Sequence, residues 1–483
     1  MNLFMIAWRS IQQRGLASAL TSLSMALGVM LVVAVLAVHG VVSDAFQNSA
    51  SLGYNLIVGA KGGKLQLTLN TVYYLSQPVE NIPYSYYLEF LSVEQRLHEE
   101  ADPGNIDLRR QGQFADFTAF AIPVCLGDYY GEFRSVGTTP DFFEKLVFGP
   151  HADQRFEFAE GRKFQHSSQE YGYWEAVAGS VAARELKLHV GDRVSPTHGD
   201  PELGTHHAEG FTVVGILKPS GTPNDRAVFV NIEGFYLMSN HAKTDGEETH
   251  TGQAATMSAD HHEEKSGAAS EHAEHAGDAH EHAEHDRDAK PLPMNQREVT
   301  AILVRTKSND PAVPAETVTP GVRWTINKGQ VAQAVAPIQE IYVLFATFVD
   351  PIQSVLLLLT AMICVVSGVS ILVSIYNSMS ERRHEIAVIR ALGAGRGTVM
   401  VIVLLESVLL CLGGGCLGWV LAHTLTWLAA PTIAARTGVS IGFLSMETSE
   451  VLLLPALLIL AVLCGLSPAV SAYRTDVAKS LGT

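Results

Sequence analysis

Long apolar runs with almost no formal charge occur at four places in this chain of 483 residues. A helix that crosses a bilayer needs roughly 20 such residues, because every backbone polar group in hydrocarbon must be hydrogen-bonded within its own segment. The runs predict four transmembrane helices, over 16–43, 351–377, 398–430 and 451–473. The first run is too long for a cleaved signal peptide and lacks a clear cleavage site, so we expect it to remain as an anchor.

Basic residues are distributed unevenly around the four runs, and this predicts their orientation. Lysine and arginine gather on the cytoplasmic side of membrane proteins. Here they accumulate in the segments 1–15, 378–397 and 474–483, which we therefore expect in the cytoplasm. The short loop 431–450 then lies on the other side, together with residues 44–350, which we call the outer domain.

The outer domain has the pattern of a mixed α+β fold. Short helices are expected over 86–99 and 181–188, and residues 329–349 predict a stalk helix that leads into the second span. Pro337 and Pro351 should bend or interrupt this helix. No spacing of nucleophile and base indicates a catalytic site. The runs that predict strands are FTAFAIPVCL, EAVAGSV, FTVVGIL, AVFVNI and VTAILVRT.

A tract rich in histidine and acidic residues interrupts the outer domain at 241–288. It holds nine of the nineteen histidines and almost no large apolar residue, so it cannot bury enough surface to offset the entropy of folding. We expect a disordered insertion, which either captures Zn²⁺ or another divalent metal loosely or is merely hydrophilic. The candidate ligands in the tract are His261, His262, His272, His275, His280, His282 and His285.

A smaller histidine cluster lies in a turn-rich segment before the strand FTVVGIL. It consists of His198, His206 and His207. Because it is closer to ordered structure than the tract is, it could form a better defined metal site. A simple surface hairpin without metal explains the same three residues slightly better.

Composition narrows the class of protein. Only 17% of the residues are charged, against about 25% in a typical soluble domain, which favours a membrane protein. The net charge of −16 excludes a broadly basic nucleic-acid binder, and most of that charge comes from the tract. The five cysteines show neither a disulfide framework nor the spacing of a zinc finger.

The loop after the second span predicts a short amphipathic helix on the inner membrane surface. In SERRHEIAVIRALGAGRGTVM, the apolar residues Ile386, Ile389 and Leu392 recur at helical spacing opposite a charged face. Gly393 is expected to end this helix, as glycine commonly does at a C-terminal cap.

The third span carries a single formal charge, Glu406. A carboxylate within a membrane is costly, so we expect it to face protein, a dimer interface or the membrane surface. Further along the same span, Gly413, Gly414, Gly415 and Gly418 would permit close approach of another helix.

These segments resemble the MacB/FtsX/LolC-type permeases of ABC transporters. The loop carries the pattern E-R-x-x-E-I-x-x-x-R-A-x-G-A, and LLESVLLCLGGGCLGWVLA is similar to the family's third span. The tail is similar to the family ending, except that Val477 stands where proline is common. FRSVGTTPDFF and AVAGSVAARELKLHVGDRV resemble pieces of the family's periplasmic core, and residues 58–75 and 81–89 are faintly similar to a zinc-linked branch.

The resemblance implies a permease subunit without catalytic activity, set in the inner membrane with its outer domain in the periplasm. ATP would bind to a separate ABC ATP-binding subunit, since the sequence has no G-x-x-x-x-G-K-[ST] loop. The permease would pair with a second copy or with a paralogous permease. The residues that would couple it to the ATPase are Glu381, Arg382, Glu385, Ile386, Arg390, Gly393 and Ala394.

Three functions remain open at this point. The permease would move or release a client, which could be a lipoprotein, lipid, peptide or drug, or would serve a divalent-metal system, with or without a periplasmic binding protein. Alternatively, it would pass the mechanical work of the ATPase to a periplasmic enzyme. A metal-sensing membrane receptor without an ATPase is the third reading, and the histidine tract is its only support.

Overall fold

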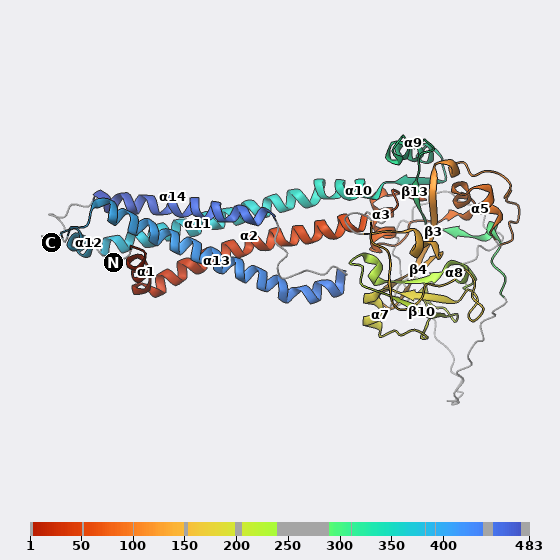
Figure 1. Cartoon of the computed structure of the whole chain (residues 1–483), viewed down its shortest axis with the longest axis horizontal. Helices are drawn as coiled ribbons and strands as arrows, with labels where there is room; N and C mark the ends of the chain where they lie inside the picture. The colour runs from red at the N-terminus through yellow and green to blue at the C-terminus, as the bar shows by residue number, and fades with distance from the viewer. Residues whose placement is uncertain are drawn as a thin grey trace, which may run out of the picture.

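The computed structural model places a long helical bundle end to end with the outer domain (Figure 1). Among the described residues, the helical segments long and apolar enough to cross a membrane are Gly15–Gly40, Pro337–Met379, Arg396–Thr432 and Glu450–Arg474. The predicted class, a multi-pass helical membrane protein with an inserted α+β domain, is confirmed. The structure describes residues 3–50, 53–99, 101–148, 153–198, 205–238, 289–310, 312–381, 383–391, 393–437 and 448–474.

The bundle contains more helix than the apolar runs alone predict. The first span continues beyond residue 43, and the third continues through Pro431, so residues 431–437 of the expected loop are helical. Residues 3–13 form a separate helix before the first span. The helices are α1 (Leu3–Gln13), α2 (Gly15–Ala50), α10 (Pro337–Leu344), the π-helix η5 (Phe345–Val349), α11 (Asp350–Glu381), α12 (Arg383–Ala391), α13 (Arg396–Thr437), the 3₁₀ turn η6 (Thr448–Leu452) and α14 (Leu453–Arg474).

The prediction of a stalk helix over 329–349 was wrong for its first residues. Ala332–Val335 form strand β14, which pairs antiparallel with β1, and the helix begins only at Pro337. Proline suits the first turn of a helix, where its missing N–H has no partner to lose. Before Pro351 the helix passes through one π-helical segment, η5, and then continues as the α-helix α11. The local pattern could not reveal the strand, because its hydrogen bonds go to a segment more than 270 residues away.

A mixed twelve-stranded sheet forms the centre of the outer domain. Its order is β14-β1-β13-β3-β4-β11-β6-β10-β5, with β7 on β10, β8 on β3 and β9 on β8. The pairs β4–β11 and β6–β10 are parallel. The strands are β1 (Leu56–Ala60), β3 (Thr118–Tyr130), β4 (Phe133–Thr138), β5 (Phe158–Gly161), β6 (Glu175–Ala178), β7 (Arg193–Val194), β8 (Thr197–His198), β9 (Thr205–His206), β10 (Phe211–Leu217), β11 (Ala227–Asn231), β13 (Ala301–Thr306) and β14 (Ala332–Val335), and β2 (Ile82–Pro83) pairs separately with β12 (Glu298–Val299).

Short helices cover the sheet, and one expected helix is broken. The segment 86–99 divides because Leu91 is extended and Ser92 starts a new helix through a capping box with Gln95. The helices are α3 (Lys64–Tyr73), α4 (Tyr84–Tyr87), η1 (Leu88–Phe90), α5 (Val93–Leu97), η2 (Ala115–Phe117), α6 (Asp141–Lys145), α7 (Ser180–Leu186), η3 (Pro223–Arg226), α8 (Ile232–Leu237), η4 (Met294–Gln296) and α9 (Ala315–Lys328).

Both faces of the sheet are buried against apolar side chains. In β1, Leu56 and Val58 enter one hydrophobic cluster, whereas Ile57 enters a second cluster with Phe142 and Phe143. Successive side chains of a strand point to opposite faces, so a strand covered on both sides reads as a continuous apolar run. This is why LIVGA lacks the alternation of a half-exposed strand.

Candidate functional site

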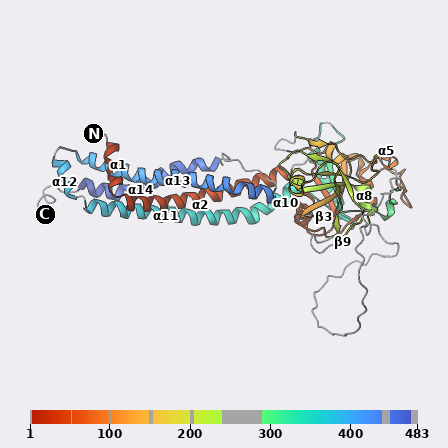
Figure 2. The ribbon, with the colours of Figure 1, turned by 90° about the horizontal axis from the view of Figure 1, so that it is seen from below.

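The helix α12, which we predicted to lie on the inner membrane surface, is at the end of the bundle away from the outer domain (Figure 2). Ala387 is buried, and Ile386 packs against the core of the bundle. Val388, by contrast, is 40% exposed. Gly393, two residues after the last residue of α12, has a φ of +103°, a backbone conformation that favours glycine.

The other residues expected to couple the permease to an ATPase lie around this helix. Glu381 is the last residue of α11, while Glu385 and Arg390 are in α12 and Ala394 follows Gly393. Arg382 lies outside the described residues.

The intramembrane carboxylate of Glu406 faces protein. Ser10 of α1 donates a hydrogen bond from its Oγ to Glu406 Oε2 at 3.2 Å, and both side chains are buried. Arg14, which follows α1, donates to the carbonyl of Ser374 on α11 at 3.0 Å. These bonds attach the N-terminal helix to two different spans, at the end of the bundle where α12 lies.

The glycines of the third span divide into those that touch a neighbouring helix and one that does not. A Cβ at Gly414 would lie 2.7 Å from the Ser22 carbonyl oxygen, and one at Gly418 would lie 2.3 Å from that of Ala26. Both contacts are with α2, so the two glycines set the approach of the first and third spans. Gly415 faces Leu457 of α14, whereas a Cβ at Gly413 would meet nothing within 4 Å among the described residues.

A polar cluster that the sequence pattern did not reveal joins the outer ends of the third and fourth spans. Glu450, which starts the fourth apolar segment, is buried and accepts a hydrogen bond from Trp419 Nε1 at 3.0 Å. His423 Nε2 lies 3.6 Å from the same carboxylate. The clue in the sequence was an aromatic residue and a histidine four positions apart on one face of the third span.

The stalk is cross-linked by a polar contact between two long helices. His39 Nε2 on α2 lies 3.3 Å from Asp350 Oδ1 at the start of α11, and its ring packs edge-on against Phe345. Figure 1 shows α2 and α10 running side by side towards the outer domain.

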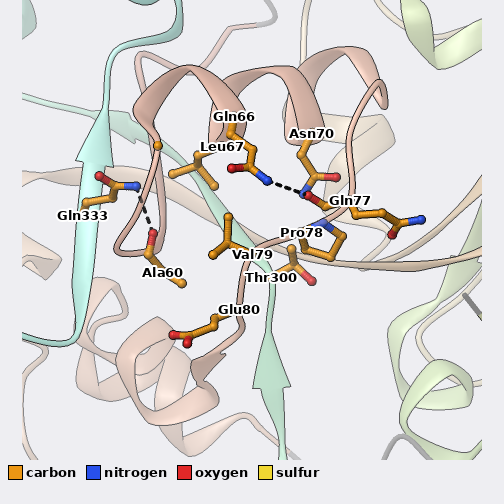
Figure 3. A pocket seen from close by; sticks show the side chains of 11 residues that line it. Ala60, Gln66, Leu67, Asn70, Gln77, Pro78, Val79, Glu80, Thr300 and Gln333 are labelled. Atoms are coloured by element: carbon orange, nitrogen blue, oxygen red, sulfur yellow. Dashed lines mark hydrogen bonds between the residues drawn. The ribbon is translucent and has the colours of Figure 1, made fainter. Parts of the chain in front are cut away.

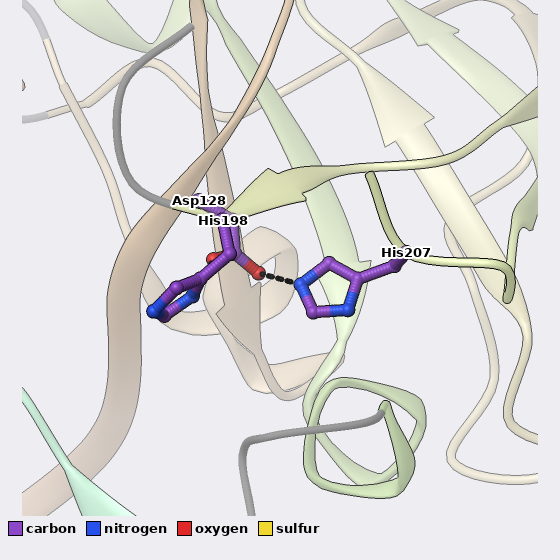
Figure 4. Close-up of side chains that lie close together, drawn as sticks. All are labelled: Asp128, His198 and His207. Carbon is purple, nitrogen blue, oxygen red and sulfur yellow. Dashed lines mark hydrogen bonds and ion pairs between the residues drawn. The ribbon is translucent and has the colours of Figure 1, made fainter. Parts of the chain in front are cut away.

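In the outer domain, the structure brings together Asp128, His198 and His207 (Figure 4). Asp128 Oδ1 lies 2.9 Å from His198 Nδ1, and its Oδ2 lies 3.6 Å from His207 Nε2. Asp128 and His207 are buried, while the side chain of His198 is 50% exposed. We call these three residues the Asp–His–His cluster. Asp128 was missed because its position, 70 residues before His198, carries no local signal.

The remaining predicted metal ligands are placed only in part. His206 pairs through its backbone with Thr197, and its side chain is outside what the structure describes. The whole tract lies outside the described residues, including His261, His262, His272, His275, His280, His282 and His285.

A narrow pocket lies between α3 and the segment 77–80 (Figure 3). Its cavity of about 10 Å³ has room for a single water molecule and none for an organic ligand. Its polar lining includes Gln66, Asn70 and Gln77. The pocket is therefore a feature of packing rather than a substrate site.

Buried ionisable side chains in the outer domain are paired or neutral. Glu175 accepts two hydrogen bonds from Arg162, at 2.9 and 2.6 Å, and one from the backbone N–H of Gln165. Burial alone would raise the pKa of Glu175, but these bonds outweigh it and lower the pKa. Burial raises the pKa of the Cys125 thiol to about 12, so this cysteine stays protonated and unreactive.

The lowered pKa of Glu175 predicts an acid-sensitive outer domain. A carboxyl group whose pKa is lower in the folded state stabilises the fold above its unfolded pKa of about 4.3, and the contribution is lost as the pH falls through the folded value. We expect Glu175→Gln to melt at a lower temperature than the wild type at neutral pH and to show a smaller further loss on acidification. Thermal unfolding of the purified protein at a series of pH values measures this. Glu316→Gln is the matched control, because Glu316 is exposed; an equal pH slope in both variants would contradict the assignment.

Together, four apolar helices and a mixed α/β domain inserted between the first two define a multi-pass membrane protein with one large extramembrane unit. The family model of the MacB-like periplasmic core domain matches residues 18–271, more than half of the chain, and that of the FtsX-like permease C-terminal domain matches residues 357–476. The chain belongs to the MacB/FtsX/LolC-type ABC transporter permeases. Permeases of this family work with an ABC ATP-binding subunit and are generally non-catalytic.

Individual relatives match over limited stretches. The macrolide export ATP-binding/permease protein MacB of Bordetella avium (strain 197N) is 35% identical over 137 residues, which are 28% of this chain and 20% of that protein. The MacB of Shewanella sp. (strain W3-18-1) is 33% identical over 117 residues, 24% of this chain and 17% of the relative. The MacB of Sodalis glossinidius (strain morsitans) is 46% identical over 70 residues, 14% and 11% of the two chains. The chain thus spans about a fifth or less of the length of these curated relatives.

Proposed function

We propose that this chain is the permease subunit that converts ATP hydrolysis on a separate subunit into conformational work on a client outside the membrane. The spans are almost free of charge, so they offer little to line a path for a hydrated ion. The observation that supports this proposal is the length of the second span. It is helical from Pro337, next to the outer domain, through the π-helix η5 to Glu381, and α12 begins two residues later.

In this mechanism, the ATP-binding subunit docks on α12 and moves it during the ATP cycle. The second span carries the movement to the stalk, where His39 and Asp350 link it to the first span. The outer domain is attached to both spans, so their relative displacement opens or closes it on the client. The two states need to differ by only a few kcal/mol for ATP to switch them. We place the chain in the inner membrane with its outer domain in the periplasm, paired with a second copy or a paralogous permease.

Val388→Asp tests the docking on α12. Val388 is exposed on this helix while Ala387 faces the bundle, so the substitution should leave the fold intact. An unpaired charge in the docking contact is expected to weaken it by about 2 kcal/mol or more. Co-purification of the ATP-binding subunit from membranes that contain both proteins measures this, and deletion of residues 381–394 should abolish it.

The control is Val331→Asp, which places the same charge on an exposed valine of the outer domain. It should leave co-purification unchanged. If the deletion of 381–394 retains the ATP-binding subunit, the docking proposal is wrong, and the reading of a receptor without an ATPase gains support.

The nature of the client is a separate part of the proposal. The Asp–His–His cluster favours a system linked to zinc or another divalent metal over lipoprotein, peptide or drug export, because two imidazoles beside a carboxylate match the ligands of such metals. A deletion strain that grows normally under zinc limitation but accumulates unreleased lipoprotein or becomes drug-sensitive would reverse this preference. Activation of a periplasmic enzyme would show as loss of that enzyme's activity with no effect on transport.

A further inference from the structure

We propose that Asp128, His198 and His207 form an exchangeable binding site for a late first-row divalent cation of the Zn²⁺ type. This inference does not rest on the proposed coupling to an ATPase, because it concerns only side chains within the outer domain. It also differs from capture by the histidine tract, because none of the three residues lies in 241–288.

A bulge in strand β3 and the pairing of β3 with β8 bring these three side chains together. Strand β3 contains a bulge between Leu126 and Tyr129, where Gly127 and Asp128 stand opposite a single residue of β4. Bulges of this kind redirect a side chain out of the regular alternation. On the other edge of β3, Asp128 is the direct partner of His198 in β8. His207 follows β9 and is held by a backbone hydrogen bond to Pro196 at 3.1 Å.

The distances suit a small tetrahedral ion. Bonds of about 2.0–2.1 Å to Zn²⁺ place neighbouring ligand atoms roughly 3.3 Å apart. The carboxylate oxygens of Asp128 lie 2.9 Å from the His198 nitrogen and 3.6 Å from that of His207, and one ligand atom from each residue lies within 4.8 Å of the others. All three atoms would reach bonding distance from one centre after a rearrangement of up to about 1.5 Å, for which the half-exposed His198 has room.

The donor set and its burial select the class of ion. Two imidazoles and one carboxylate favour Zn²⁺ and its neighbours over Mg²⁺ or Ca²⁺, which prefer oxygen ligands only. Asp128 is fully buried, and a buried carboxylate is costly unless a cation or hydrogen bonds compensate it. Arg134 lies near enough for its charge to interact with Asp128, but it donates to the Ser76 carbonyl and to Gln77, so the imidazoles contact the carboxylate directly.

The open side of the cluster predicts exchange. Structural zinc sites are closed by four protein ligands, whereas three ligands leave a fourth position for water or an incoming ligand. Here the exposed side of His198 provides that opening. A bound ion would tie His198 of β8 and the residue after β9 to β3, and would thereby fix the hairpin on the sheet.

Zinc titration of the full-length protein in detergent tests the site. All nine histidines of the tract are first replaced by glutamine, which removes the loose sites while keeping the chain length. In this background we expect one Zn²⁺ per chain by competition with a chromophoric chelator, a higher melting temperature with Zn²⁺, and a tetrahedral Co²⁺ absorption spectrum. Asp128→Asn and His207→Gln should each weaken binding by at least about tenfold.

The matched control is His189→Gln. His189 Nδ1 lies 3.6 Å from Asp192 on the same domain. No third metal ligand joins this pair among the described residues, so loss of His189 should leave zinc affinity unchanged. The proposal is overturned if the tract-substituted protein melts as the wild type does but binds no Zn²⁺, which would make the cluster a set of hydrogen bonds only. It is also overturned if binding persists at wild-type affinity in both Asp128→Asn and His207→Gln. Because these readouts are independent of ATP, they do not depend on the docking test of Val388.

Discussion

Replacing Arg297 by methionine is expected to destabilise the outer domain by about 3–5 kcal/mol. Arg297 donates two hydrogen bonds to Glu233, at 2.8 and 2.7 Å, and both side chains are almost fully buried. Its Nε donates to the Leu292 carbonyl, and its guanidinium lies over the rings of Tyr84 and Tyr236. Burial alone would lower the pKa of Arg297, but Glu233 outweighs this effect and raises the pKa. Removing Arg297 would leave a buried carboxylate without its cation.

The Arg297–Glu233 pair joins residues on the two sides of the segment 239–288. Glu233 is in α8, a few residues before the undescribed segment 239–288, and Arg297 comes shortly after that segment. The pair therefore closes the base of a long insertion, so that the strands β11 and β13 on either side of it can keep their places in the sheet.

Denaturant unfolding or limited proteolysis of the purified protein measures the effect of Arg297→Met. The matched control is Lys218→Met, which breaks an ion pair with the same separation of 2.7 Å, from Lys218 Nζ to Glu157, but on the exposed surface. Exposed ion pairs are screened by water and contribute little, so this variant should unfold almost as the wild type does. Equal effects of the two substitutions would show that burial does not set the strength of the Arg297 pair. A double variant, Glu233→Leu with Arg297→Met, should recover part of the loss because no charge remains buried.

The second large effect is expected from Gly418→Leu in the third span. A Cβ at this position lies 2.3 Å from the carbonyl oxygen of Ala26, so any side chain must push α13 away from α2. Overpacking costs typically 1–3 kcal/mol where side chains can yield, and here the obstacle is backbone. We expect a lower melting temperature in detergent and a loss of ATP-driven activity, since the first and third spans can no longer move as one body.

Gly413→Leu is the matched control in the same helix. A Cβ at Gly413 meets nothing within 4 Å among the described residues, and leucine has a higher helix propensity than glycine by roughly 0.8 kcal/mol. The variant should therefore melt at or slightly above the wild-type temperature. If Gly413→Leu and Gly418→Leu lower the melting temperature equally, the rotation of the third span described here is wrong.

Much of the bundle was predictable because the lipid environment imposes a strict rule. A long run without charge must form a helix in hydrocarbon, where no water can satisfy backbone groups. The apolar runs therefore identified four spans, and the motif from Glu381 to Ala394 indicated the inner-face helix. The same rule does not give the rotation of a helix about its axis. It could therefore not distinguish Gly418, which touches Ala26, from Gly413, whose Cβ would meet nothing within 4 Å in the described part of the chain.

The outer domain shows even more clearly that contacts between distant residues could not be predicted from the sequence. Strands β10 and β13 were recognisable from their apolar residues, but Ala332–Val335 read as helix until its pairing with β1 made it a strand. The partner of His198 is Asp128, and that of Arg297 is Glu233, each more than 60 residues away. Hydrophobic pattern and local motif act over a few residues, and for this reason the sequence by itself determined the spans and the family. Which charges meet, which glycines touch and which histidines share a carboxylate depend on strand register and helix rotation, and these were decided only when distant segments packed together.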